Sequence, residues 1–204
     1  MPRFRIASAL VFCLIVVGVI GAVAMAGGGA GGQRVRISAL PGVSTVSAGS
    51  SDGSTAKFAF LARQTSNSCG LEPSALAGMP SRMRLQGSCC FPMNLAAYKS
   101  QVRGLRAYSG LSAIPGDPYD VPVSLAKQML QYDRTIRLST EQTQTYSRAM
   151  RIATTKGPCC CRCWRWYAFR GLSKHLIADR GWTAKRIAAV IDLLEGCGGP
   201  ADHA

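Results

Sequence analysis

The sequence has few acidic residues and almost no histidine. Of its 204 residues, 10 are Asp or Glu and two are His, at His175 and His203. It offers no Ser/His/Asp grouping, no glycine loop spaced to hold phosphate, and no carboxylate pair beside a plausible base. We therefore predict no catalytic residue, favour a function other than catalysis, and interpret His175 as an ordinary half-buried histidine. Any metal site has to depend mainly on sulfur.

Alternation of polar and apolar residues, the pattern of a β-strand, is also scarce. Apolar residues recur at intervals of three and four, which predicts helices. Ser139 or Thr140 is expected to cap one helix and Thr183 the last. We predict an all-α, small, cysteine-rich domain of about four to five helices. The helices are expected from Phe91-Pro92-Met93 to about 107, from Pro122 through Leu130, from Ser139 to Gly157, over Trp164 to Ala178, and from Thr183 to Gly196.

The N-terminal region is typical of an export signal. Arg3 and Arg5 precede an uncharged apolar stretch, residues 6–26, which ends in Ala24-Met25-Ala26, small residues at the spacing that a signal peptidase recognises. The stretch is either cleaved after Ala26 or kept as a transmembrane signal anchor. Both outcomes predict an extracytoplasmic protein of the bacterial envelope, anchored in the cell membrane or secreted. We divide the chain into the leader (1–26), a flexible Gly/Ser/Ala-rich linker (27–56) and a helical domain (57–204).

The chain is strongly basic, with a formal net charge of +14. Such a charge suits an anionic neighbour, and outside the cytoplasm anionic lipid or an anionic wall polymer is the expected partner. Aromatic and basic residues alternate near Trp164 and Trp166, as in some single-strand-binding proteins. An exported chain meets little nucleic acid, however, so we expect none as a partner and expect these aromatic residues to pack in the core.

Cysteine is the residue type that stands out. Cys13 lies within the leader and is interpreted as an apolar passenger; the other eight cysteines follow it: Cys69, Cys89, Cys90, Cys159, Cys160, Cys161, Cys163 and Cys197. An even number of cysteines in an exported chain is typical of disulfides, and we expect the isolated Cys69 and Cys197 to be disulfide-bonded. Adjacent cysteines rarely bond each other. Cys89 and Cys90 could instead bond two of the four downstream cysteines.

The clustered cysteines also fit a soft-metal site. Cys159, Cys161 and Cys163 alternate within one tight turn, so their sulfurs can share an ion, and Cys160 is a possible further ligand. Thiolates select Cu(I), Zn(II) and heavier soft ions, and the two thiols of Cys89 and Cys90 together with the thioether of Met93 suit Cu(I). The helix expected to start near the cluster would lower thiol pKa values through its dipole.

The run Pro158-Cys159-Cys160-Cys161-Arg162-Cys163 is similar to the signature of the bacterial PCYCGC-motif lipoproteins, small exported proteins presumed to bind metal. Cys159, Cys161 and Cys163 fall on the three cysteines of that motif, while Cys160 replaces its tyrosine and Arg162 its glycine. The helix ahead of the run, with Tyr146, also looks like the segment that precedes the motif in that family; the match ends at Cys163. The resemblance covers about 25 residues and implies an exported cysteine-motif protein.

Three functions stay open at this point. The first is a protein that binds a soft metal through clustered thiolates, for sequestration, sensing or delivery. The second is a disulfide-stapled interaction domain that acts through its basic surface. The third is a thiol-disulfide oxidoreductase, since Cys160 and Cys163 have C-x-x-C spacing, although the βαβ pattern of a thioredoxin-like fold is missing.

Overall fold

The structure, a computed structural model, describes residues 53–199. This part of the chain is mostly helical, in agreement with the predicted helical class, but it contains more helices than predicted and a small sheet. The helices are α1 (Thr55–Leu61), α2 (Pro73–Gly78), α3 (Leu95–Leu105), the 3-10 helix η1 (Arg106–Tyr108), α4 (Val123–Thr135), α5 (Thr140–Ile152), α6 (Trp164–Ala178) and α7 (Ala184–Leu193). The strands are β1 (Arg84–Gln86) and β2 (Asp120–Pro122).

Several helices begin where a short polar side chain can bond the free amides of the first turn. The Ser139 side chain accepts a hydrogen bond from the backbone N–H of Gln142, and the Gln142 side-chain oxygen accepts one from the backbone N–H of Ser139, which completes a capping box. The Thr183 side chain caps α7 by accepting a hydrogen bond from the backbone N–H of Arg186. Both predicted caps are confirmed, as is the start of the predicted helix at Pro122, where α4 follows directly.

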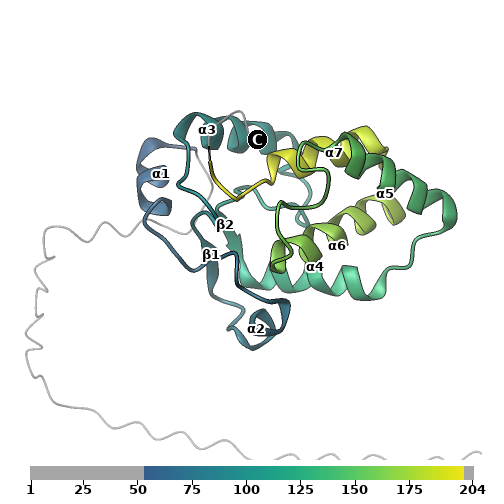
Figure 1. Ribbon diagram of the computed structural model, residues 1–204, viewed down its shortest axis with the longest axis horizontal. Coiled ribbons are helices and arrows are strands. Elements are labelled where there is room, and N and C mark those ends of the chain that lie inside the picture. The colour runs from purple at the N-terminus through teal and green to yellow at the C-terminus, as the bar shows by residue number, and fades with distance from the viewer. Residues whose placement is uncertain (1–52, 200–204) are drawn as a thin grey trace, which may run out of the picture. The chain divides into compact units, whose positions relative to one another are not determined.

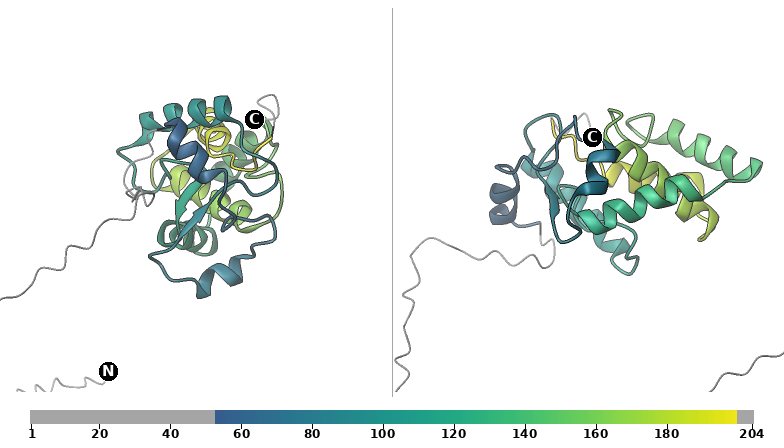
Figure 2. Two further views of the ribbon diagram at one scale, coloured as in Figure 1. Left: turned by 90° about the vertical axis from the view of Figure 1, so that its left-hand side faces the viewer. Right: turned by 90° about the horizontal axis from the view of Figure 1, so that it is seen from below.

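Two pairs of helices build most of the core. Helix α4 packs along α6, and α5 packs on α7 (Figure 1). The closest approach is at Gly171, where a Cβ would overlap the carbonyl oxygen of Met129. Helix α1 lies at one end of the domain and α5 at the other, as the views of Figures 1 and 2 agree. A second, smaller cluster of Leu61, Tyr98, Val102 and Tyr119 joins α1 to α3.

Two predicted boundaries need correction. The helix expected to begin at Phe91-Pro92-Met93 begins at Leu95, capped by Asn94. Phe91 and Pro92 stay outside it because their backbone bonds Cys197 and Gly199 instead. Helix α5 ends at Ile152 and not at Gly157.

The small sheet and helix α1 were not predicted from the sequence. The strands β1 and β2 pair antiparallel, with Leu85 opposite Val121. Each has only three residues, too few to show alternation. Helix α1 begins at Thr55, within the range predicted for the linker.

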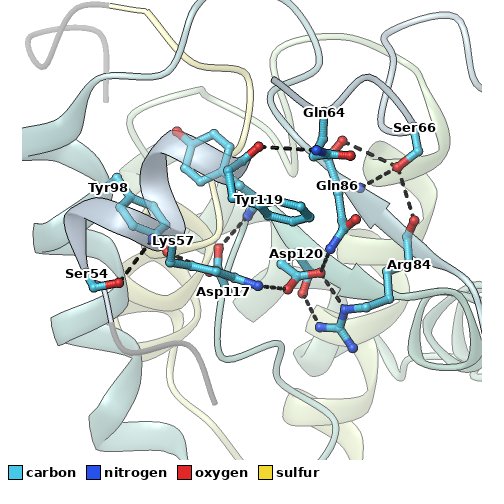
Figure 3. A network of polar contacts seen from close by, with 11 residues as sticks. Ser54, Lys57, Gln64, Ser66, Arg84, Gln86, Tyr98, Asp117, Tyr119 and Asp120 are labelled. Carbon is cyan, nitrogen blue, oxygen red and sulfur yellow. Dashed lines mark hydrogen bonds and ion pairs between the residues drawn. The ribbon is translucent and has the colours of Figure 1, made fainter. Parts of the chain in front are cut away.

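A polar network fixes strand β1 against its surroundings (Figure 3). The buried carboxylate of Asp120 pairs with Lys57 and Arg84, both at 2.5 Å, and accepts a hydrogen bond from Gln86 at 3.0 Å. Burial raises the pKa of Asp120, but the hydrogen bonds and charges of Arg84 and Lys57 outweigh it and hold the pKa below its usual value. The network matters for function because the chain leaves β1 through Gly87 directly toward Cys89 and Cys90.

The predicted leader and nearly all of the predicted linker lie outside the described residues. Within residues 53–199, no helix is long and apolar enough to cross a membrane.

Candidate metal centre

Four separate segments of the chain bring their cysteines to one place. The segment after β1 lies between two others: Cys69 donates its backbone N–H to the carbonyl of Cys89, and Cys89 and Cys90 donate theirs to Gly196 and Cys197. The fourth segment is the turn between α5 and α6, which carries Cys159 to Cys163 and runs beside the chain after α7 (Figure 1). The backbone bonds fix the first three segments relative to one another, and Trp164, directly after the turn, donates its backbone N–H to the carbonyl of Leu71. Together these bonds place the thiols.

All eight cysteines within residues 53–199 are in contact through their sulfur atoms. The Sγ of Cys69 lies 3.0 Å from that of Cys161, and the Sγ of Cys89 lies 3.5 Å from those of Cys90 and Cys197. Further contacts, at 3.7 to 4.0 Å, join Cys159 to Cys197 and Cys90 to both Cys160 and Cys161. The Sγ of Cys163 lies within 4.8 Å of those of Cys159 and Cys161 and beside that of Cys89.

Four groups of three cysteines have the spacing that a shared metal ion requires. In each group the three sulfurs lie within 4.8 Å of one another. The groups are Cys69, Cys90 and Cys161; Cys89, Cys90 and Cys197; Cys159, Cys160 and Cys197; and Cys159, Cys161 and Cys163.

The structure brings together nearly every residue that the sequence singled out as a ligand. Cys159, Cys161 and Cys163 form one group, and Cys89, Cys90 and Cys160 belong to the others. Met93 lies elsewhere, packed against the small cluster that joins α1 to α3. The thioether sits three residues past Cys90, in the segment that continues to α3, and so turns with that segment away from the thiols.

The sequence reasoning missed Cys69 and Cys197 as members of the cluster. Both were expected to be disulfide-bonded. Cys197 does lie at disulfide-bonding distance from Cys160, whereas Cys69 is a free thiol. The local sequence around either residue does not indicate that it belongs to the cluster. Both residues reach the cluster through backbone bonds to residues far along the chain.

One cysteine has the electrostatic environment of a thiolate. Cys163 is the N-cap of α6, as the predicted helix start implied, and its sulfur lies beside the thiols of Cys159 and Cys89 and near the backbone N–H of Arg165. These neighbours hold the pKa of Cys163 well below its usual range. The pKa values of Cys89 and Cys159 are raised, first by their interaction with Cys163 and second because they are buried.

A buried cation lies beside the cluster. The guanidinium of Arg165 is fully buried and donates to the carbonyls of Leu194 and Pro118. Within residues 53–199 it forms no ion pair with a carboxylate. Its charge lowers the pKa of both Cys89 and Cys159 against the larger opposing effects. A buried charge of this kind needs a counter-charge, and the acidic groups around it are the thiols and the carboxylate of Glu195.

The fold and the cluster together define a mostly helical, cysteine-rich domain with convergent thiols. No protein-family model matches the chain, and neither does any curated protein or solved structure. The similarity to the PCYCGC-motif lipoproteins stays a prediction.

Proposed function

We propose that this protein binds soft metal ions, Cu(I) or Zn(II), through its clustered cysteine thiolates, and that it sequesters, senses or delivers them outside the cytoplasm. The observation that carries the proposal is the meeting of eight thiols from four segments of the chain in groups of three. Packing alone does not explain why eight thiols meet, since a structural cysteine is a small apolar side chain that any core position accommodates. Soft ions, by contrast, require several sulfurs in one place.

The accessibility of the thiols suits the exchange of an ion. Cys69, Cys90 and Cys160 are exposed, and Cys159, Cys163 and Cys197 are buried. An incoming ion can therefore meet a thiol at the surface and pass to a neighbour a few ångströms deeper. A cavity lined in part by Phe91, Thr155 and Glu195 opens beside Cys160 and Cys197. The membrane, and the anionic lipid or wall polymer near it, remains the proposed surroundings.

A disulfide-stapled interaction domain is the second candidate, and Cys160 with Cys197 favours it because they lie at bonding distance. Their Cα atoms are 7.3 Å apart, whereas those of disulfides are usually about 4.4–6.8 Å apart. Two ligands of one ion tolerate the longer separation. An oxidoreductase needs one exposed reactive thiol and a resolving partner. Cys163, which has the lowered pKa, is buried, and this weighs against that function.

Intact mass spectrometry of the protein purified from the envelope distinguishes the two candidates. Under the metal proposal, native spectra show a mass excess that matches bound ions, and denatured, chelated protein is alkylated at three or more cysteines. Four disulfides would instead give a mass lower by eight hydrogens and no alkylation, and the metal proposal would then be abandoned.

A pair of variants tests the ligands themselves. Cys159→Ser with Cys161→Ser disrupts all but one of the four groups and is expected to lower metal uptake to at most one ion. Met93→Leu is the matched control, because it removes a sulfur that lies outside the cluster. Under the disulfide alternative the double variant would chiefly lower stability, by about 2–5 kcal/mol for each bridge lost.

A further inference from the structure

The four groups of cysteines are linked in a closed cycle. Each consecutive pair of groups has one cysteine in common: Cys90, then Cys197, then Cys159, then Cys161, which leads back to the first group. Each group also has one cysteine of its own, which is Cys69, Cys89, Cys160 or Cys163. Four shared and four unshared thiols account for all eight cysteines within the described residues. Separate mononuclear sites would have no need of shared ligands.

From this connectivity we propose that the domain holds four Cu(I) ions in a ring, each bound by two shared thiolates and one unshared thiolate. The inference rests on the proposed function and specifies its metal, its capacity and its ligands. Shared cysteines bridge neighbouring ions, as thiolate sulfur can because it has more than one lone pair. Unshared cysteines are terminal ligands on the outside of the ring.

The number of ligands in each group selects the ion. Cu(I) accepts three thiolates in a trigonal arrangement, whereas Zn(II) in structural sites is almost always bound by four ligands. Within the described residues, none of the four groups includes a histidine or a carboxylate that would supply a fourth ligand. The groups are therefore complete for Cu(I) and one ligand short for Zn(II).

The charge of the ring agrees with its surroundings. Four Cu(I) ions with eight thiolates leave four negative charges in excess, whereas four Zn(II) ions would leave none. The buried guanidinium of Arg165, which forms no ion pair with a carboxylate within residues 53–199 although its charge also acts on Glu195, lies where it can offset part of that excess. Its buried Nε has no hydrogen-bond partner in this part of the chain. The N-terminus of α6, at Cys163, adds a positive helix dipole.

Loading requires the bond between Cys160 and Cys197 to be open. A dithiol reductant opens it by exchange: one thiolate attacks a sulfur of the pair to form a mixed disulfide, and the second thiol releases the protein as the reductant closes its own disulfide. Two electrons and two protons thus pass from the dithiol to Cys160 and Cys197. Each thiol that becomes a ligand then gives up its proton to solvent as Cu(I) binds.

The ring is tested by counting ions on the full chain in the Cys13→Ser background, so that only the eight clustered thiols are present. The protein is reduced, titrated anaerobically with Cu(I) buffered by a competing chelator, and followed by native mass spectrometry. A dominant species with four copper ions is expected. X-ray absorption should give three sulfur neighbours for each copper together with copper–copper scattering.

Two matched substitutions distinguish a ring from separate sites. Cys69→Ser removes an unshared ligand and is expected to lower the capacity to three ions, whereas Cys90→Ser removes a shared ligand and is expected to lower it to two. Both residues are exposed, so the fold is expected to survive, and circular dichroism checks it. Equal effects of the two substitutions, or saturation at one copper or one zinc ion, would overturn the ring and leave the proposed function standing. Failure to bind either metal would overturn both.

Discussion

Asn67 connects three of the cysteine-bearing segments through its side chain. The residue is 1% exposed. Its amide nitrogen donates to the carbonyl of Gly87 at 2.8 Å, and its amide oxygen accepts the indole N–H of Trp164 at 3.0 Å. Gly87 lies two residues before Cys89, and Trp164 follows Cys163. Asn67 is therefore a positioning residue for the thiols rather than a ligand.

Replacing Asn67 with Ala is expected to weaken both the fold and the cluster. The change leaves the buried N–H of Trp164 and the carbonyl of Gly87 without partners, at a cost of about 2 kcal/mol in the free energy of unfolding. Urea denaturation measures that loss, and chelator competition measures the accompanying fall in metal affinity. Asn94→Ala is the control, since it removes a helix cap outside the cluster and should leave the affinity unchanged. A normal affinity in the Asn67 variant would refute the positioning role.

Asp120 gives a prediction on pH dependence. Its folded-state pKa lies below the ordinary 3.8, so the stability that it contributes is complete above that value and is lost as the pH falls through the folded pKa. Asp120→Asn leaves Lys57 and Arg84 without their counter-charge, and is expected to lower the free energy of unfolding at pH 7 by about 3 kcal/mol. Denaturation curves of the two proteins should converge in acid. The exposed Asp179→Asn serves as control.

At the scale of secondary structure, the contact of α4 with α6 depends on one missing side chain. A Cβ at Gly171 would overlap the carbonyl oxygen of Met129. Gly171→Ala is therefore expected to destabilise the protein by about 3 kcal/mol, even though alanine is the better helix former. Gly78→Ala, where no atom lies within 4 Å of the added Cβ, is the matched control. Thermal unfolding compares them, and a Gly171 variant as stable as the control would show that the helices can move apart freely.

The helices that the sequence predicted well are those with local signals. Ser139 and Thr183 cap their helices through residues three positions away, so a short window of sequence contains the whole interaction. The start of α3 was misplaced because Pro92 suits a first turn as well as it suits the irregular segment that it occupies. That segment is bonded to Cys197 and Gly199 instead of joining the helix, and no local pattern could reveal these bonds.

The residues of the candidate site also fall into those that local sequence predicts and those that it does not. Cys159, Cys161 and Cys163 could be grouped from their spacing alone, since neighbouring positions in one turn cannot be far apart. Cys69 and Cys197 could not, because their place depends on backbone pairing with the segment after β1. Met93 was grouped with Cys90 by its spacing, but the chain between the two does not form a turn of helix, and Met93 packs against the small cluster that joins α1 to α3.

At the scale of the whole molecule, the cluster joins the beginning, middle and end of the described domain. A ligand that binds only the folded state stabilises it according to its free concentration relative to its dissociation constant, by about 2.7 kcal/mol at a hundredfold excess. The copper-loaded protein is expected to unfold at a markedly higher urea concentration than the reduced, metal-free protein. Fluorescence of the three tryptophans follows the transition. Identical midpoints would show that the ion does not connect the segments.

The distribution of the cysteines along the chain also sets the order in which the site can form. Cys159, Cys161 and Cys163 can meet as soon as their turn exists, whereas Cys89 and Cys197 are 108 residues apart and Cys69 and Cys161 are 92 apart. Closing such long loops costs chain entropy, and chains rich in distant contacts fold slowly. The local group is thus open to an ion throughout folding. An ion bound there early would hold the local group in place. The distant segments that carry Cys69, Cys89 and Cys197 would then bind to it as the chain folds.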